Sequence, residues 1–170
     1  MVELKAKVDN HIDFRKRLSA IGADYVGVFQ QRDEYFVVPE GRLKLRTVEN
    51  TDITELIYYE RENALGPKND DAYILKVKKS EDLKRILKKI LKSLIVVEKT
   101  REIYMYEGTQ IHLDNVKNLG KFIEFERKTS DEPANVKRNQ MTLKKLMETL
   151  QISSSNLEAY SYSDIIENRT

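Results

Sequence analysis

Charged and apolar residues alternate along six short segments of the chain, and this alternation limits its fold more than any other feature. Residues 1–8 (M-V-E-L-K-A-K-V) place Glu3, Lys5 and Lys7 on one face of a strand, because successive strand side chains point to opposite faces. The same spacing recurs in five further sets, Arg42/Lys44/Arg46, Lys76/Lys78, Lys99/Arg101, His112/Asp114 and Glu124/Glu126. The pattern predicts antiparallel strands that each carry one charged and one apolar face.

These charged faces admit two arrangements. In the first, each is the solvated side of an ordinary antiparallel sheet, which suffices for any single strand of this kind. In the second, helices cover the apolar faces of a curved sheet, and the charged faces point inward and line a tunnel. Six such strands favour the tunnel. Roughly ten Lys and Arg side chains inside it then need counter-charges, which acidic residues supply in part and a bound triphosphate would complete.

Two helices are expected between the strands. The first ends at Gly22, because Phe14, Leu18 and Ile21 have the spacing of one helical face. The second begins after Ser80, a favourable capping residue. Its expected apolar stripe consists of Leu83, Ile86, Leu87, Ile90, Leu91 and Leu94.

The chain is expected to form one α+β domain over residues 1–170. Two related halves, about residues 1–71 and 72–130, each have the pattern of a strand, a helix and three strands. A third helix over residues 133–150 follows, and the remaining segment, rich in Ser and Asn, is expected to be a loosely attached tail. Short turns between the strands predict antiparallel sheets with the helices packed outside.

The charge balance and composition exclude several classes of protein. Charged residues make up 34% of the chain, but its formal net charge is only +2, so we expect no general binding of nucleic acid. No segment approaches the roughly 20 apolar residues of a membrane-spanning helix, and no secretory signal is evident, so no membrane association and a cytoplasmic location are expected. The absence of Cys excludes disulfides, zinc–thiolate sites and thiol catalysis.

Six stretches of sequence resemble a known family in their order and spacing. They are V-E-L-K-A-K-V, Q-R-D-E-Y-F, G-R-L-K-L-R, E-K-T-R-E-I-Y, I-H-L-D-N-V and L-G-K-F-I-E-F-E. Together they resemble the CYTH superfamily, which includes class IV adenylyl cyclases, thiamine triphosphatases and inorganic triphosphatases. The likeness covers nearly the whole chain and is closest to the class IV cyclases and their archaeal relatives. It implies a closed tunnel of eight antiparallel strands with helices packed outside.

The resemblance also implies a set of site residues. The family signature E-x-E-x-K has its second Glu at Glu3 and its Lys at Lys5, whereas Met1 stands in place of the first Glu. Glu3, Lys5 and Glu124 are the implied catalytic residues. The implied ligands of a divalent cation, Mg²⁺ or Mn²⁺, are Glu3, Asp114, Glu124 and Glu126. The implied phosphate contacts are Lys5, Lys7, Arg42, Lys44, Arg46, Arg61, Lys76, Lys99 and Arg101.

Two further positions depart from the family pattern. Lys121 replaces an acidic residue that is common after the L-G turn, which changes the electrostatics there. The usual R-x-E-x-E pattern is absent around residues 71–73, which leaves nucleotide contacts from that strand unsupported. His112 is expected to be an ordinary polar strand residue, because one histidine does not make a metal site.

The resemblance implies a metal-dependent enzyme that converts ATP into cyclic AMP and pyrophosphate, with lysines and arginines holding the leaving group. The alternative is a triphosphatase for inorganic, nucleoside or thiamine triphosphate, in which the same cations hold the substrate while water attacks the γ-phosphate. The third hypothesis is a non-catalytic module that binds a nucleotide or polyphosphate. Relatives suggest a homodimer.

Overall fold

The computed structural model describes residues 1–60, 65–69, 71–78, 81–130 and 132–168. Within them, nine antiparallel strands form one sheet in the order β5-β1-β9-β8-β7-β2-β3-β4-β6. The strands are β1 (Val2–Val8), β2 (Asp24–Phe36), β3 (Arg42–Val48), β4 (Ile53–Glu60), β5 (Lys68–Asn69), β6 (Asp71–Lys78), β7 (Ser93–Tyr106), β8 (Thr109–Val116) and β9 (Gly120–Arg127). The helices are α1 (Ile12–Ala20), α2 (Glu81–Ile90), α3 (Pro133–Thr149) and α4 (Tyr162–Glu167), with a 3-10 turn at Ser154–Asn156. No helix in the described ranges combines the length and apolar character that a membrane crossing requires.

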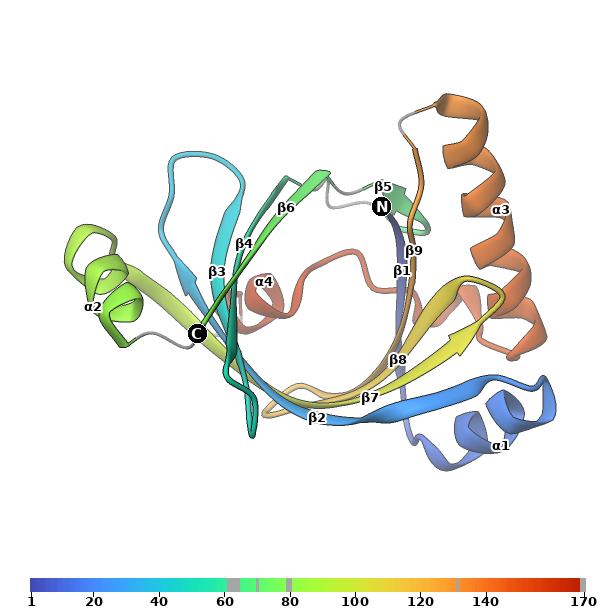
Figure 1. Cartoon of the computed structure of the whole chain (residues 1–170). Helices are drawn as coiled ribbons and strands as arrows, with labels where there is room; N and C mark the ends of the chain where they lie inside the picture. Colours follow the sequence, from blue (N-terminus) through green and yellow to red (C-terminus); the bar gives the residue numbers. More distant parts are fainter. Residues whose placement is uncertain (61–64, 70, 79–80, 131, 169–170) are drawn as a thin grey trace.

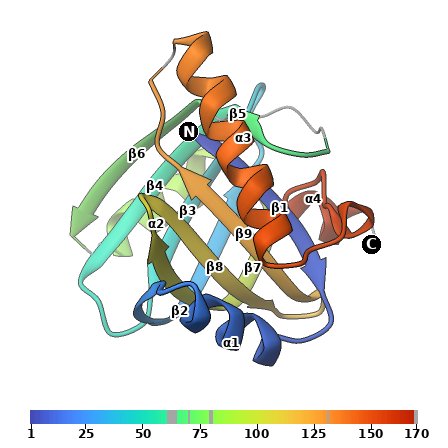
Figure 2. The same cartoon turned by 90° about the vertical axis from the view of Figure 1, so that its right-hand side faces the viewer.

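The sheet curves strongly around a central space (Figure 1), with α1, α2 and α3 outside it and α4 at one end of it (Figure 2). The expected closed tunnel of eight strands needs correction, because no ladder joins β1 to β6 in the described part of the chain. β5 pairs with β1 through only two positions, Val2↔Asn69 and Glu3↔Lys68, and β6 then runs along β4. Two residues are too few to close the sheet, so the tunnel is open between β1 and β6.

The register of the strands brings opposite charges together on the inner face of the sheet. Directly opposed pairs are Asp33/Arg46 on β2 and β3, Arg101/Asp114 on β7 and β8, and Lys5/Glu124 on β1 and β9. Side chains that lie directly opposite each other on neighbouring strands have Cβ atoms about 5 Å apart, which is within reach of an ion pair. The alternation in the sequence therefore becomes a lining of paired charges.

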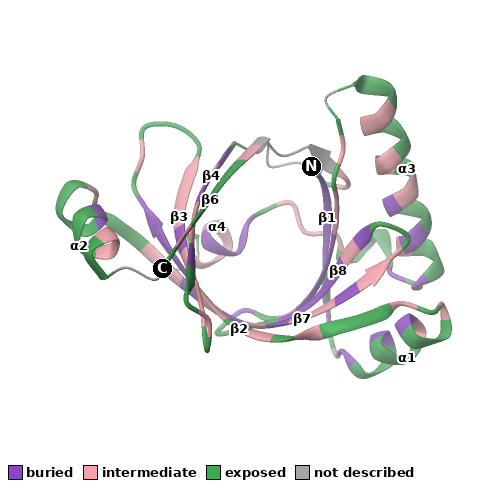
Figure 3. Cartoon of the chain, viewed as in Figure 1, coloured by how far each residue is buried: buried purple, intermediate pink, exposed green. Residues whose placement is uncertain are grey.

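The apolar faces of β1, β8 and β9 pack beneath α1 and α3. This core includes Leu4, Ile111, Ile123 and Phe125 from the strands, Phe14 and Leu18 from α1, and Leu143, Leu146 and Leu150 at α3 and its C-terminal end. Figure 3 shows that the buried positions concentrate on these strands and on the sides of the helices that face them. Each fully buried side chain of this size contributes about 2 kcal/mol, so the core holds the inner charges in place.

The second helix buries less of its apolar stripe than expected. In α2, Leu87 is buried in a small cluster with Phe36, Leu45, Leu83 and Leu91. The helix ends at Ile90, and the other half of the stripe, Ile86, Ile90 and Leu94, is exposed. The expected stripe is therefore only partly a packing face, because the cluster beneath the helix is small.

Residues 151–168 do not form the loose tail that their composition predicts. The Ser161 hydroxyl accepts a hydrogen bond from the backbone N–H of Asp164, and the Asp164 carboxylate accepts one from the backbone N–H of Ser161, which caps α4. Tyr162 is 5% exposed and packs edge-on against Phe122, with ring centroids 4.9 Å apart. A polar composition does not reveal this attachment, because it depends on one capping box and one buried ring.

Candidate active site

A cavity of about 110 Å³ lies inside the curve of the sheet, between strands of both halves and α4. Its walls include five cations, Lys5, Lys44, Arg46, Lys99 and Arg101, and three carboxylates, Glu3, Glu124 and Glu126. A larger hollow of about 660 Å³ lies between β2, β3, β7 and α2 and shares only Lys99 with this cavity. We place the candidate site in the smaller cavity, because most of the buried charged side chains gather around it.

One side of the cavity carries a basic cluster that consists of Asp33, Lys44, Arg46 and Lys99. Arg46 donates to both carboxylate oxygens of Asp33, with Nε–Oδ1 at 2.7 Å and Nη2–Oδ2 at 2.8 Å. The Nζ atoms of Lys44 and Lys99 lie 3.0 and 3.8 Å from Asp33 Oδ2. Burial opposes ionisation of Asp33, but the three cations outweigh it and hold the pKa of Asp33 well below its ordinary value. One carboxylate facing three cations leaves this cluster attractive to anions.

Asp33 was not among the predicted site residues. A signal was present, since Asp33 and Tyr35 alternate in Q-R-D-E-Y-F in the same way as the charged sets do. Its partner could not be read from that pattern, because the Asp33↔Arg46 pairing depends on the register of the β2–β3 hairpin.

Lys99 has a strongly perturbed pKa within the basic cluster. Burial disfavours its ammonium form and the neighbouring Arg101 repels it, so that the pKa of Lys99 falls to about 7 despite the attraction of Asp33. A lysine of this kind changes its charge near neutral pH. A bound anion would restore the proton, because it stabilises the charged form.

The opposite side of the cavity carries an acidic cluster that consists of Glu3, Lys5, Arg101, Asp114, Glu124 and Glu126. Arg101 donates to both oxygens of Asp114, at 2.7 Å through Nε and 2.6 Å through Nη2, and Nη2 also lies 2.5 Å from Glu124 Oε2. Lys5 Nζ lies 3.3 Å from Glu3 Oε1 and 3.2 Å from Glu124 Oε1. Four carboxylates facing two cations leave this cluster attractive to metal ions.

Both central carboxylates of the acidic cluster are ionised at neutral pH. Burial raises the pKa of Asp114, but Arg101 and Lys99 outweigh it and bring that pKa down to about 2. Burial acts in the same direction on Glu124, where Lys5 and Arg101 hold the pKa well below its ordinary value. Ionised carboxylates are the form that binds a divalent cation.

Three side chains of the described chain have the spacing of a metal site. They are His112, Glu124 and Glu126, whose ligand atoms all lie within 4.8 Å of one another. Carboxylate oxygens suit Mg²⁺ and Mn²⁺, so the donor set fits the divalent cation that the family resemblance implies. Glu3 and Asp114 belong to the same acidic cluster but lie outside this group of three. His112, expected to be an ordinary strand residue, is buried beside the two carboxylates.

The buried cations of the cavity have protein carboxylates as partners. Each of the five lies within 4.0 Å of a carboxylate oxygen. Three of these cations share one carboxylate, Asp33. The expectation that an external anion completes the charge balance therefore stays a prediction, and it applies to the basic cluster.

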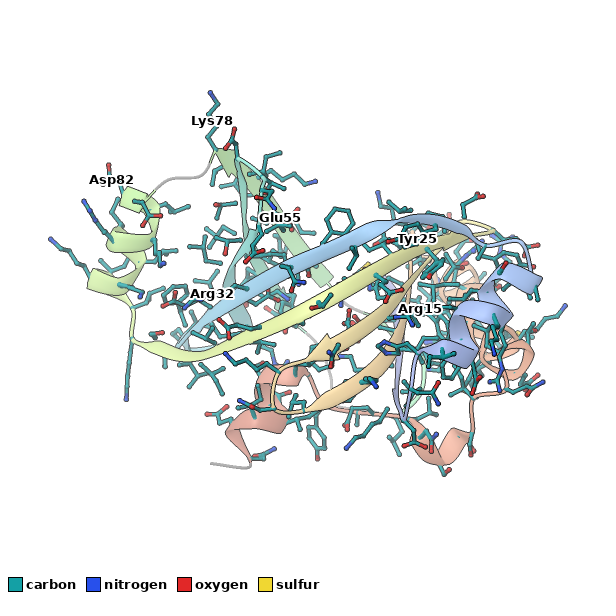
Figure 4. The ribbon with its side chains drawn as sticks, turned by 90° about the horizontal axis from the view of Figure 1, so that it is seen from below. Arg15, Tyr25, Arg32, Glu55, Lys78 and Asp82 are labelled. Atoms are coloured by element: carbon teal, nitrogen blue, oxygen red, sulfur yellow. The ribbon has the colours of Figure 1, made fainter. Side chains whose placement is uncertain are left out.

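Three of the expected phosphate contacts, Lys7, Arg42 and Lys76, are not among the described residues that line the cavity. Arg42 pairs with Asp164 of α4, with Nη2–Oδ2 at 2.8 Å, and Lys76 is largely exposed beside Glu55, with Nζ–Oε1 at 3.5 Å. Lys7 is exposed on β1. Figure 4 shows that Lys78, the next charge along β6, projects away from the sheet. Arg61, the remaining expected phosphate contact outside this set, lies outside the described residues.

Tyr162 of α4 connects the two clusters. Its hydroxyl donates to Asp114 Oδ2 at 2.8 Å, and its ring centroid lies 4.4 Å from Lys5 Nζ and 5.2 Å from Lys99 Nζ. An ammonium over an aromatic ring is stabilised by about 1–2 kcal/mol when desolvated. The C-terminal segment therefore forms part of the site, although the sequence analysis placed it outside.

The chain was compared with known proteins. It is 29% identical to a Methanocaldococcus jannaschii protein named "Putative adenylate cyclase MJ0240", over 96% of this chain and 97% of that one. Its fold is similar to the PH1012 protein of Pyrococcus horikoshii, with a TM-score of 0.86, 24% identity and coverage of 96% and 97% of the two chains. It is also similar to Hippeastrum HpAC1, with a TM-score of 0.69, 14% identity and coverage of 99% and 96%. That structure is described as a "putative adenylyl cyclase" that "reveals a dominant triphophatase activity".

The family match agrees with the curved sheet and its charged interior. The CYTH domain family matches residues 1–162, which include every strand and the start of α4. The chain belongs to the CYTH domain family.

Proposed function

We propose that the protein is a metal-dependent enzyme that acts on a triphosphate, with a class IV adenylyl cyclase-like reaction as its activity. The observation that carries this proposal is the pairing of two opposite charge clusters in one cavity. The basic cluster offers Lys44, Arg46 and Lys99 to phosphate oxygens, and the acidic cluster offers Glu124 and Glu126 to a cation. A metal-bound triphosphate has the same two kinds of charge, and the named relative from M. jannaschii supports the cyclase reaction.

The residues of the acidic cluster would hold the metal, and those of the basic cluster would hold the phosphates. When bound, a divalent cation would polarise a phosphoryl oxygen and reduce the charge repulsion between substrate and carboxylates. Lys5 and Arg101 lie between the two groups, so they can exchange part of their contact with Glu124 for contact with a phosphate oxygen. In a cyclase reaction the β- and γ-phosphates leave together as pyrophosphate, and the cations of the basic cluster stabilise that charge.

Hydrolysis of a smaller triphosphate is the second candidate, and the size of the cavity favours it. Ligand pockets for drug-sized molecules commonly measure about 300–1,000 Å³, whereas this cavity measures about 110 Å³. It suits a chain of phosphates better than a whole nucleotide. A cyclase would have to leave the nucleoside at the open side, near β6, where Ala72 and Ile74 line the cavity.

Product analysis separates these functions. The purified protein is incubated with Mn²⁺ and either ATP or tripolyphosphate, and the products are resolved by chromatography. Cyclic AMP with pyrophosphate supports the cyclase, and ADP or free phosphate supports hydrolysis. Binding of these ligands without turnover supports the third hypothesis, a non-catalytic module that binds a nucleotide or polyphosphate.

The site itself is tested with a matched pair of variants. Glu124→Gln is expected to lower turnover by about a hundredfold, because it removes a charged group from the reacting centre. Glu98→Gln is the control, since Glu98 pairs with Lys117 at a partly exposed position. If Glu124→Gln turns over and binds metal-triphosphate like the wild type, the proposed site is wrong.

A further inference from the structure

His112 is buried at the edge of the acidic cluster with one ring nitrogen directed at two carboxylates. It lies on β8 directly opposite Glu124 of β9 and is 1% exposed. Its Nδ1 atom lies 3.4 Å from Glu124 Oε2 and 3.7 Å from Glu126 Oε1. Ligands at about 2.1 Å from one metal ion lie about 3 Å from each other when they are neighbours. A shift of less than 1 Å would therefore bring the three atoms around a single ion.

The other ring nitrogen of His112 has a partner that orients the ring. Nε2 lies 2.9 Å from Gln110 Oε1 on the same strand, so the Nε2–H group can donate to this carbonyl oxygen. In that tautomer Nδ1 presents a lone pair to Glu124 and Glu126, whose carboxylates also present lone pairs. The three groups then favour a cation beside them, a place that the Arg101 guanidinium takes in this structure. Histidine ligands of metals commonly donate their second N–H to an oxygen acceptor in this way.

We propose that His112 is a nitrogen ligand of the metal ion, together with Glu124 and Glu126, and that the site therefore prefers Mn²⁺ or Co²⁺ to Mg²⁺. The inference rests on the proposed metal-binding role of the two carboxylates and adds a ligand on a different strand. The affinity of a nitrogen ligand for first-row transition ions rises from Mn²⁺ to Co²⁺ and beyond, so imidazole favours Mn²⁺ slightly and Co²⁺ more strongly over Mg²⁺, which is bound chiefly by carboxylates, carbonyl oxygens and water. The chain has only one other histidine, His11, so a magnetic coupling between the metal ion and an imidazole nitrogen can be assigned to one of two residues by substitution.

Arg101 occupies the corresponding position in this structure. Its Nη2 atom lies 2.5 Å from the same Glu124 oxygen that faces His112, and its Nη1 atom lies 3.9 Å from the same Glu126 oxygen. The guanidinium also holds Asp114 through two hydrogen bonds, so it keeps a carboxylate partner if Glu124 turns to a metal. A metal ion and Arg101 therefore compete for the same carboxylate oxygens. A nitrogen ligand from His112 would strengthen metal binding and so favour the metal ion over Arg101.

Pulsed electron paramagnetic resonance of the full chain with Mn²⁺ alone tests the proposal. The wild-type protein is expected to show coupling of Mn²⁺ to one imidazole nitrogen. His112→Asn is expected to lose that coupling and to bind Mn²⁺ roughly tenfold or more weakly, with little change for Mg²⁺. His11→Asn is the matched control and keeps the coupling, because His11 is buried elsewhere, with Nε2 3.1 Å from the Phe122 carbonyl oxygen.

The outcomes distinguish this inference from the proposed function. If the wild type binds Mn²⁺ without nitrogen coupling and Glu124→Gln abolishes binding, His112 is not a ligand but the carboxylate site stands. If Mn²⁺ does not bind at all, both proposals fail. The nitrogen coupling of the wild-type protein shows whether His112 is a ligand even if a His112 variant does not fold. Circular dichroism shows whether the variant is folded.

Discussion

The two clusters of the cavity use the same kinds of residue in opposite proportions. In the basic cluster three cations share the single carboxylate of Asp33, whereas in the acidic cluster four carboxylates face Lys5 and Arg101. Both are held by neighbouring strands of one curved sheet, and both are shielded from water. The difference shows that the cavity is polarised, with an anion-attracting side on β2, β3 and β7 and a cation-attracting side on β1, β8 and β9. Each side should therefore respond to a different ligand.

Removing the only carboxylate of the basic cluster is expected to have the largest effect. Asp33→Asn removes the carboxylate that Lys44, Arg46 and Lys99 share and leaves only Glu55, 4.0 Å from Arg46, as a nearby counter-charge among the described residues. It should lower the free energy of unfolding by about 3–5 kcal/mol, as measured by urea denaturation. Tripolyphosphate should restore part of this loss, because it supplies the missing negative charge, and Mn²⁺ should not. Asp82→Asn is the control, since Asp82 is exposed on α2 (Figure 4) and its pair with Arg85 is worth less than about 1 kcal/mol. A loss no larger than that of the control would contradict the polarised cavity.

Removing a cation from the acidic cluster should also destabilise the protein, but with the opposite ligand restoring stability. Arg101→Met leaves Asp114 and Glu124 with less compensation and is expected to cost about 3 kcal/mol in the same assay. Here Mn²⁺ should restore stability and tripolyphosphate should not. Equal rescue by both ligands in both variants would show that the two sides are not distinct.

Much of the polarised cavity follows from the sequence, because strand charge at a spacing of two can be recognised without tertiary information. The alternation marks the charged strand faces, and the family resemblance assigns their residues to the site. The residues so assigned that line the cavity are Glu3, Lys5, Lys44, Arg46, Lys99, Arg101, Glu124 and Glu126. The partners within each cluster were not predicted, because cross-strand pairing depends on register. Asp33 was missed for that reason. His112 was set aside because one histidine does not make a metal site, and its pairing with Glu124 on another strand again depends on register.

Two features of the fold lay beyond local patterns. The edge between β1 and β6 is open because β5 pairs with β1 at only two positions before β6 pairs with β4. The alternation of charged and apolar residues does not indicate how many positions of two strands will pair. The docking of α4 depends on contacts between residues far apart in the chain, such as Tyr162 with Asp114 and Arg42 with Asp164. The segment that forms α4 is short and polar, so it has no hydrophobic periodicity from which these contacts could be predicted.

The pKa of Lys99 offers a test of the basic cluster by pH. An unfolded lysine has a pKa of about 10.4, whereas that of Lys99 is about 7 in the folded protein. Between these values the unfolded chain binds more protons, so the contribution of Lys99 to the free energy of unfolding rises with pH across this window. Lys99→Met should flatten this rise in denaturation measurements between pH 7 and 10.

Proton uptake on ligand binding is a second test of the Lys99 pKa. At pH 8, a metal-bound triphosphate is fully ionised, and its binding next to Lys99 should draw protons from the buffer, up to one per site, if the complex holds the charged lysine. Titration calorimetry in two buffers of different ionisation enthalpy measures this uptake. Lys99→Arg should bind without it, because arginine is already charged. Equal uptake by the wild type and by this variant would assign the proton to another group.

The smallest expected effect concerns the residue that joins the two sides. Tyr162→Phe keeps the ring near Lys5 and Lys99 but removes the hydroxyl that donates to Asp114. The hydrogen bond has a charged acceptor, so its loss should cost about 1.5 kcal/mol in the urea assay.

Tyr160→Phe is the matched control, because Tyr160 is 45% exposed in the same segment. Since the hydroxyl donates to Asp114 of the acidic cluster, Tyr162→Phe should weaken metal binding more than tripolyphosphate binding. If it instead weakens both ligands equally, α4 acts as a packing element for the whole cavity, and the distinction between the two sides does not extend to this residue.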